Sequence, residues 1–245
     1  MGSFDVGILN VGSYDAYLIF LGDDNHNSAV NKTSFEVTQT GTNFNIIANS
    51  TAITYGDSVE ITQSLPGDAT GRVTYRFADG TVIKVVGVKE SFVLSDLDAG
   101  SYVVYADYSG SGKYAPACDS VTITVSKANV TVSVEVLDKV YTADVNGNVF
   151  ANVDGQYKVV IGNYESLVIV KDGVGSFDVG ILDVGKYTAS VSFDGTDNYN
   201  SANNETTFKV TRTGTNFNII PNSTVIVYGG AVEIAQGLPG DATGS

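Results

Sequence analysis

The sequence predicts an all-β chain made of repeated antiparallel sandwiches, and three observations lead to this prediction. Apolar and polar residues alternate at period two almost throughout, and helical periodicity is nearly absent. Short segments rich in Gly, Asn and Asp separate the alternating runs, as turns between strands require. The chain also repeats itself, because residues 2–71 match residues 175–244 without a gap and with 49 identities in 70 positions.

The expected strands each place their apolar residues on one face. Three of them repeat one pattern of inward residues, namely Tyr14, Ala16, Leu18 and Phe20 in 14–20, Tyr102, Val104, Ala106 and Tyr108 in 102–108, and Tyr187, Ala189, Val191 and Phe193 in 187–193. Residues 121–125 and 130–136 alternate Val or Ile with Thr, Ser or Glu, as half-buried strands do. Asp79-Gly80, Asn146-Gly147 and Asp172-Gly173 predict tight hairpin turns, since these residues tolerate positive φ.

An older repeat lies inside the long one. Pairs such as Phe92 and Phe177, or Tyr102 and Tyr187, stand 85 residues apart, so two related units alternate along the chain. This frame predicts complete domains at 41–127 and 128–212. Residues 1–40 then form the C-terminal half of a unit and residues 213–245 the N-terminal half of another. We therefore expect a segment of a longer tandem array, with self-association through the truncated ends.

A local motif narrows the fold. Leu97-Asp-Ala-Gly-Ser-Tyr102 recurs as Leu182-Asp-Val-Gly-Lys-Tyr187 and as Leu9-Asn-Val-Gly-Ser-Tyr14. A Tyr just after such a turn resembles the tyrosine corner of immunoglobulin-like sandwiches, in which the hydroxyl bonds back to the turn. We expect structural tyrosine corners at Tyr14, Tyr102 and Tyr187, and hence tandem immunoglobulin-like β-sandwiches of Greek-key type, two complete and two partial. The alternative, a plain hairpin with a buried Tyr, still leaves an antiparallel sandwich.

Composition excludes several classes of function. Thirteen Lys and Arg against 27 Asp and Glu give a net charge of −14, which makes nucleic acid and anionic membranes poor partners. The single His26 and the single Cys118 leave little for nucleophilic catalysis, a Cys-rich zinc site or an internal disulfide. No apolar run approaches the ~20 residues of a membrane helix, so no membrane insertion by this segment is expected. The sequence thus predicts no catalytic residues, no cofactor and no enzyme.

Two kinds of candidate site remain. Five Asn residues fit the N-glycosylation acceptor pattern, namely Asn31, Asn49, Asn129, Asn204 and Asn222. In residues 194–200, Asp194, Asp197 and Asn200 offer the oxygen ligands that calcium takes. We nevertheless expect an ordinary solvated turn without metal, and calcium is the alternative, because Lys113 stands where a ligand would be in the counterpart loop at 109–114.

Several motifs of the 41–127 unit carry a family resemblance. Tyr55-Gly-Asp-Ser-Val-Glu-Ile61, Leu65-Pro-Gly-Asp-Ala-Thr-Gly71 and Tyr108-Ser-Gly-Ser-Gly-Lys-Tyr-Ala-Pro-Ala117 together resemble the bacterial-type Ig-like repeats of adhesin-like surface proteins from methanogenic archaea. The 128–212 unit resembles them less, since it keeps the Leu182 to Tyr187 corner but lacks the Leu-Pro-Gly-Asp-Ala-Thr-Gly segment. The resemblance implies long secreted stalks on the cell envelope and supplies no catalytic residues.

These observations predict a non-catalytic, extracellular, cell-surface stalk of repeated domains that projects or forms an adhesive surface. Its expected partners are neighbouring repeats of the same protein, and surface glycans or proteins of other cells. The alternative is a carbohydrate- or protein-binding module that acts directly through its Asp/Asn loops and its outward Tyr17 and Tyr105.

Overall fold

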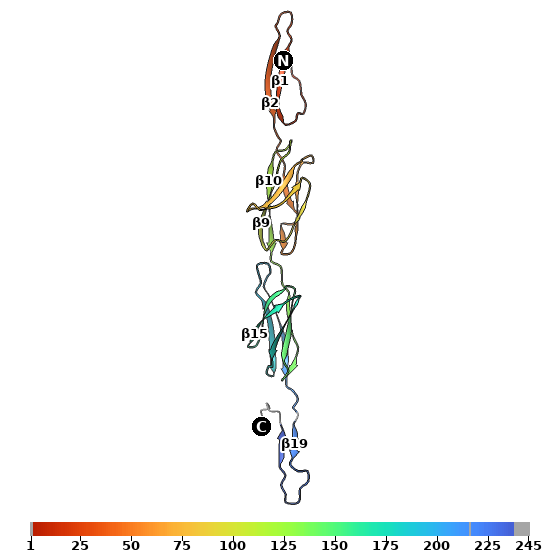
Figure 1. Cartoon of the computed structure of the whole chain (residues 1–245), viewed down its shortest axis with the longest axis vertical. Helices are drawn as coiled ribbons and strands as arrows, with labels where there is room; N and C mark the ends of the chain where they lie inside the picture. The colour runs from red at the N-terminus through yellow and green to blue at the C-terminus, as the bar shows by residue number, and fades with distance from the viewer. Residues whose placement is uncertain (1, 216, 238–245) are drawn as a thin grey trace. The chain divides into compact units, whose positions relative to one another are not determined.

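The computed structural model describes residues 2–215 and 217–237, and every regular element among them is a β-strand (Figure 1). The strands divide between two compact units. Unit 1 extends from the N-terminus to Ala128 and includes Asp197–Tyr199, and unit 2 contains Asn129–Thr196 and the residues from Asn200 onward. The prediction of an all-β chain is therefore confirmed.

Unit 1 contains a sandwich of two sheets. One sheet has the strand order β4-β10-β9-β6-β7, and the other has the order β3-β5-β8. The strands are β3 (Asn45–Ala48), β4 (Ala52–Thr54), β5 (Val59–Ser64), β6 (Arg72–Phe77), β7 (Val82–Gly87), β8 (Phe92–Leu94), β9 (Gly100–Tyr108) and β10 (Ala117–Ser126). The chain passes back and forth between the two sheets, and the hairpins β6–β7 and β9–β10 stay within the larger one, which is the arrangement of an immunoglobulin-like Greek key.

The core of this sandwich lies between the inward faces of the two sheets. Val59 and Ile61 of β5 are fully buried on one side, and Val73 and Tyr75 of β6 on the other. The polar residues between them, such as Glu60, face outward. Period-two alternation in the sequence thus becomes one buried and one exposed face on each strand.

Unit 2 repeats this architecture. Its two sheets have the orders β12-β18-β17-β14-β15 and β11-β13-β16. The strands are β11 (Val132–Val136), β12 (Lys139–Val140), β13 (Val145–Ala151), β14 (Gly155–Ile161), β15 (Tyr164–Val170), β16 (Val174–Gly180), β17 (Gly185–Phe193) and β18 (Ala202–Thr211). Tyr157, Val159, Val149 and Phe208 are among its most deeply buried side chains. The sandwich strands thus end within the expected limits 41–127 and 128–212, and those limits remain a prediction.

In both sandwiches the first strand of the larger sheet pairs in parallel with the last strand. β4 lies beside β10, with Ala52 opposite Thr124, and β12 lies beside β18, with Lys139 opposite Val210. All the other strand pairs within these two sandwiches are antiparallel. The chain enters the first sandwich at Thr40, which bonds to Lys113 and Ala115 just before β10 begins, and it enters the second at Asn129, which bonds to Asn200 just before β18 begins. It leaves each sandwich after β10 or β18 ends, and therefore at the opposite end.

Two further hairpins form sheets of their own. β1 (Gly12–Phe20) pairs with β2 (Ala29–Val37), and β19 (Asn218–Pro221) pairs with β20 (Ile234–Gly237). Many of their large apolar side chains are exposed.

Two of the three expected turns have the expected backbone, and the third prediction was wrong. Gly80 has a φ of 90° between β6 and β7, and Asp172 and Gly173 have φ values of 53° and 88° between β15 and β16. Asn146-Gly147 instead lies inside β13, paired with β16. A Cβ on Gly147 would lie 2.5 Å from the carbonyl oxygen of Glu135, so this glycine serves a close approach between strands rather than a turn.

Candidate functional site

The three expected tyrosine corners have the corresponding hydrogen bonds. The hydroxyl of Tyr102 donates to the carbonyl oxygen of Asp98 at 3.0 Å, and that of Tyr187 donates to Asp183 at 2.8 Å. Tyr14 donates to Asn10 at 2.8 Å. Each bond returns four residues along the chain and joins the start of a long strand to the turn that precedes it.

The glycine of the motif lies directly beneath the tyrosine ring. A Cβ on Gly100 would lie 3.7 Å from the ring of Tyr102, and one on Gly185 would lie 3.4 Å from the ring of Tyr187. The ring therefore lies over the glycine two residues before it. A Cβ at these positions would make ordinary van der Waals contact with the ring.

A further tyrosine of this kind was missed. The hydroxyl of Tyr157 donates to the carbonyl oxygen of Val153 at 2.8 Å, again four residues back, and Gly155 lies beneath its ring. The ring is fully buried, unlike those of the expected corners. The sequence contains Gly155-Gln-Tyr157, which has the Gly-x-Tyr spacing of the motif. In the expected corners one residue separates the Asp or Asn from the Gly, whereas Gly155 follows Asp154 directly.

The Leu65-Pro-Gly-Asp-Ala-Thr-Gly71 motif ties two loops together at one end of the unit 1 sandwich. Asp68 accepts hydrogen bonds from the ammonium group of Lys113 and the hydroxyl of Tyr114, both at 2.6 Å. Lys113, and then Tyr114, hold the pKa of Asp68 at about 2. Thr70 supplies the carbonyl oxygen that the hydroxyl of Tyr108 reaches at 2.7 Å.

The last glycine of this motif is required by both conformation and space. Gly71 has a φ of 111°, and a Cβ there would lie 2.6 Å from the carbonyl oxygen of Gly110. The motif therefore has a structural role, because it holds two loops together. Its second copy, at 238–244, lies outside the described residues.

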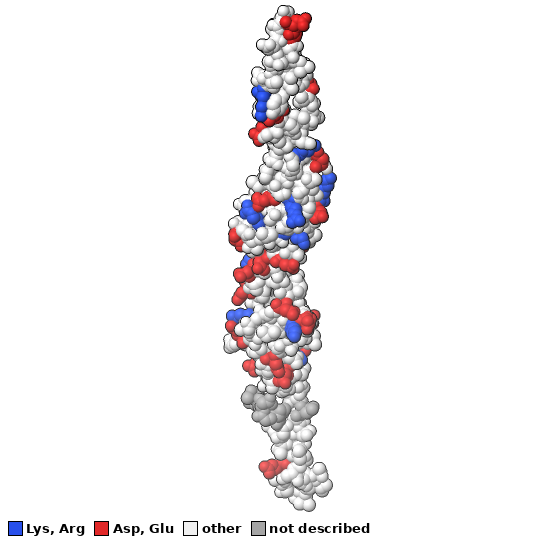
Figure 2. Space-filling view, turned by 45° about the horizontal axis from the view of Figure 1, so that its top comes forward, with Lys and Arg blue, Asp and Glu red and all other residues white. Residues whose placement is uncertain are grey.

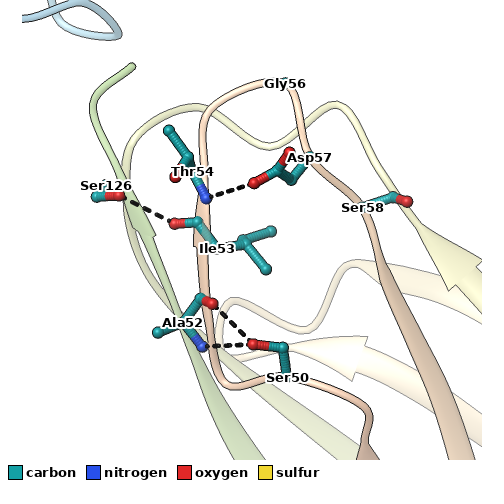
Figure 3. A pocket seen from close by; sticks show the side chains of 8 residues that line it. All are labelled: Ser50, Ala52, Ile53, Thr54, Gly56, Asp57, Ser58 and Ser126. Atoms are coloured by element: carbon teal, nitrogen blue, oxygen red, sulfur yellow. Dashed lines mark hydrogen bonds between the residues drawn. The ribbon is translucent and has the colours of Figure 1, made fainter. Parts of the chain in front are cut away.

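A surface pocket of about 660 Å³ lies beside β4 in unit 1, and polar atoms dominate it (Figure 3). Ser50 Oγ bonds to both the N–H and the carbonyl oxygen of Ala52, and Asp57 accepts from the N–H of Thr54. Ser126 Oγ donates to the carbonyl oxygen of Ile53 at 3.1 Å. These groups shape the entry of β4 into the sheet by bonding to its own backbone.

The alternative of a calcium site at residues 194–200 gains no support from the grouping of acidic side chains. Within residues 2–215 and 217–237, no group of three or more His, Cys, Asp or Glu side chains could hold a metal ion. The amide of Asn200 donates to Asn129 Oδ1 at 2.9 Å. The solvated turn at 194–200, with calcium at Asp194, Asp197 and Asn200 as the alternative, remains a prediction.

All five glycosylation candidates are exposed, and Asn49 and Asn222 each bond to the backbone of a glutamate. Asn49 exchanges hydrogen bonds with the backbone of Glu60 through its own N–H and its Oδ1, both at 3.0 Å. Asn222 repeats this arrangement with Glu233. Asn31 lies in β2 and Asn204 in β18. The side chain of Asn49 therefore supports the backbone pairing next to β5. Modification of any of the five remains a prediction.

The two outward tyrosines each lie beneath a cation. Lys32 Nζ is 5.5 Å from the ring centroid of Tyr17, and the guanidinium of Arg76 is 4.8 Å from that of Tyr105. Arg76 also donates to Asp107 at 2.7 Å. The ring of Tyr105 is therefore partly covered, whereas Tyr17 is 58% exposed.

The single His and the single Cys are both exposed. His26 is exposed, with its Nδ1 2.8 Å from Asp23 Oδ1, and Cys118 is an exposed free thiol on β10. On the face shown in Figure 2, basic and acidic side chains are interspersed over the two sandwiches. Among the described residues, no helix is long and apolar enough to cross a membrane.

Comparison with known proteins adds little to this description. No family model matches the chain, and no curated protein matches it. A solved structure of fibronectin(III)-like modules of Clostridium thermocellum CbhA is similar at 12% identity and a TM-score of 0.29, over 68% of this chain and 94% of that one. The assignment to immunoglobulin-like sandwiches therefore comes from the strand order and tyrosine geometry of the chain itself.

Proposed function

We propose that this chain is part of a non-catalytic, cell-surface stalk of repeated immunoglobulin-like domains. The observation that carries the proposal is the parallel pairing of β4 with β10 and of β12 with β18. A domain that the chain enters and leaves at opposite ends can be joined to copies of itself in a line. The near-copy repeats in the sequence are consistent with such an array.

The same pairing suits a load-bearing role. A force applied to the two ends of a sandwich acts along β4 and β10, or along β12 and β18, and loads all their connecting hydrogen bonds together. In unit 1 these bonds include Tyr55 N–H to Ser126 O at 2.8 Å and Thr124 N–H to Thr51 O at 2.9 Å. The net charge of −14 favours a soluble stalk whose modules do not stick to one another.

Single-molecule force spectroscopy on the chain, tethered at both ends, tests the proposal. We expect two cooperative unfolding events, each with a length gain of roughly 25–30 nm for a sandwich of this size. The event of unit 1 should need the higher force, because β4 pairs with β10 at three positions and β12 with β18 at two. Gradual extension at low force, without discrete events, would contradict a load-bearing stalk.

One observation favours the alternative, a module that binds a glycan or protein directly. The outward face of the β1–β2 hairpin carries Tyr17, Ile19, Leu21 and Val30, and each is at least 58% exposed. The equivalent positions in unit 2 are Ser190, Ser192, Asp194 and Asn203. This apolar face is thus particular to one repeat, and it would remain outward in a complete sandwich.

A glycan or cell-binding assay separates the two functions. Under the alternative, the wild-type chain binds and the double variant Tyr17→Ser with Ile19→Ser, which restores the residues of unit 2, does not. Absence of binding by the wild type, together with discrete unfolding events under force, would favour the stalk.

A further inference from the structure

The β1–β2 hairpin is a second copy of the β17–β18 hairpin. Its nine residue pairs, from Gly12 opposite Val37 to Phe20 opposite Ala29, match those from Gly185 opposite Val210 to Phe193 opposite Ala202. The two hairpins therefore have the same register. The strands that pack against β17 in unit 2 therefore indicate which kind of strand fits against β1.

The inward face of the β1–β2 hairpin has the apolar residues of a sandwich core, but several of these residues are exposed. Leu18 is 71% exposed, whereas its equivalent Val191 is 1% exposed. Phe35 is 41% exposed, whereas Phe208 is 1% exposed. Phe4, in the segment before β1, shows the same contrast with Phe177, at 81% against 7%. Exposed apolar area of this extent is a strong driving force for binding.

The strand edge of β1 is also open. In unit 2, β14 pairs antiparallel with β17, with Ile161 opposite Ala189 and Val159 opposite Val191. In unit 1, β6 pairs with β9 in the same way. Within the described part of the chain, β1 pairs with β2 alone. A surface pocket of about 620 Å³ also lies on this hairpin, lined by Phe4, by Ala16, Tyr17 and Leu18 of β1, and by Asn31, Lys32 and Thr33 of β2.

We propose that β1 binds a β-hairpin of the β14–β15 type by antiparallel strand addition. The first strand of this partner carries apolar side chains at alternate positions, as β14 does with Tyr157, Val159 and Ile161, all of which are buried in unit 2. The residue equivalent to Val159 lies opposite Leu18. Backbone hydrogen bonds supply part of the affinity, and the alternate apolar side chains supply the specificity.

Charge distinguishes this partner from a second copy of the hairpin. Residues 1–40 contain five acidic residues and one Lys, so two such hairpins repel each other. Residues 154–171, which cover β14 and β15, contain two acidic residues and two Lys and are neutral overall. Such binding is a property beyond the proposed stalk, and the force measurement does not test it.

A binding titration tests the inference. A fluorescent peptide of residues 154–171 is titrated with the full chain and followed by anisotropy, and we expect saturable binding at a ratio of one to one. Leu18→Asp should weaken the binding at least tenfold, because it places a carboxylate on the face that the peptide covers. Ile19→Ser should change it less than about threefold, because Ile19 faces outward and Ser192 is its equivalent in unit 2.

Two further measurements keep the test independent of the folding of any one variant. The peptide variant Val159→Asp should bind at least tenfold more weakly to the unaltered chain. The peptide variant Val159→Lys should recover affinity for Leu18→Asp, since the two charges would lie opposite each other in the proposed register. The inference is overturned if the wild-type peptide does not bind, if Leu18→Asp and Ile19→Ser weaken binding equally, or if the chain pairs with itself and the peptide does not displace it.

Discussion

At the scale of single residues, hydrogen bonds of the same type differ in how deeply they are buried. Tyr157 and Tyr187 both lie in unit 2, and both donate to a carbonyl oxygen four residues back at 2.8 Å. The bond of Tyr157 is partly buried, whereas that of Tyr187 is exposed. Water can replace the lost donor at an exposed carbonyl but less readily at a buried one.

Tyr157→Phe is therefore expected to cost more stability than Tyr187→Phe. We expect a loss of about 1–3 kcal/mol in the free energy of unfolding for the first and about 0.5–1.5 kcal/mol for the second. Urea unfolding of the two variants and the wild type gives both values. An equal or larger loss for Tyr187→Phe would show that burial of the carbonyl does not decide the cost.

Asp68 makes the stability of unit 1 depend on pH in the acid range. Its pKa in the fold is about 2, lowered from the ordinary value of 3.8 by Lys113 and Tyr114. A lowered pKa stabilises the fold above the ordinary value, and this contribution is lost as the pH falls from about 4 through 2. Asp68→Asn should thus reduce the stability of unit 1 at pH 7 and have little effect below pH 2.

Titration of the carboxyl group by NMR checks the cause. Lys113→Met should raise the pKa of Asp68 towards 3.8, because Lys113 makes the largest contribution to lowering it. Lys84→Met, which removes a charge from β7, serves as the control and should leave the pKa of Asp68 low. A low pKa in Lys113→Met would assign the effect to Tyr114 instead.

At the scale of strands, two glycines of unit 2 that look alike in the sequence differ in their surroundings. A Cβ on Gly147 would lie 2.5 Å from Glu135 O and 2.6 Å from the ring of Phe177. A Cβ on Gly155 would meet its nearest neighbour at an ordinary 3.6 Å. Gly147→Ala should therefore cost about 1–3 kcal/mol of stability through overpacking, and Gly155→Ala should stay within about 0.5 kcal/mol of the wild type. Thermal unfolding of the two variants compares them, and equal losses would mean that β13 can shift to admit a methyl group.

The same strands show how far the sequence alone could lead. Alternation identified the buried residues of β9 and β17 because successive side chains in a strand point to opposite faces of the sheet. Asn146-Gly147 was misread because a glycine that permits positive φ and a glycine that admits a neighbouring strand look the same in one sequence. Tyr157 was missed for a related reason, since its partner carbonyl belongs to a turn without the Leu-Asp-x-Gly pattern. Contacts between strands distant in sequence decide such cases, and a single sequence does not contain them.

At the scale of the whole molecule, charge repulsion between chains opposes the attraction between the apolar faces of their hairpins. The chain carries a net charge of −14, and residues 1–40 contribute five acidic residues against one Lys. In the same segment Phe4, Ile8 and Leu18 are each at least 71% exposed. Repulsion between chains extends over a Debye length of about 30 Å in 0.01 M salt but only about 3 Å in 1 M salt. Attraction between apolar faces does not weaken in this way.

Association of the chain with itself should therefore increase with salt. We expect sedimentation velocity to show a monomer in 0.01 M sodium chloride and a larger, concentration-dependent species in 1 M. Leu18→Asp should shift the 1 M sample back towards the monomer, because it adds a charge to an apolar face, whereas Lys84→Met on the unit 1 sandwich should not. If association decreased with salt instead, contacts between opposite charges would hold the chains together, and the exposed faces of the β1–β2 hairpin would not be the cause.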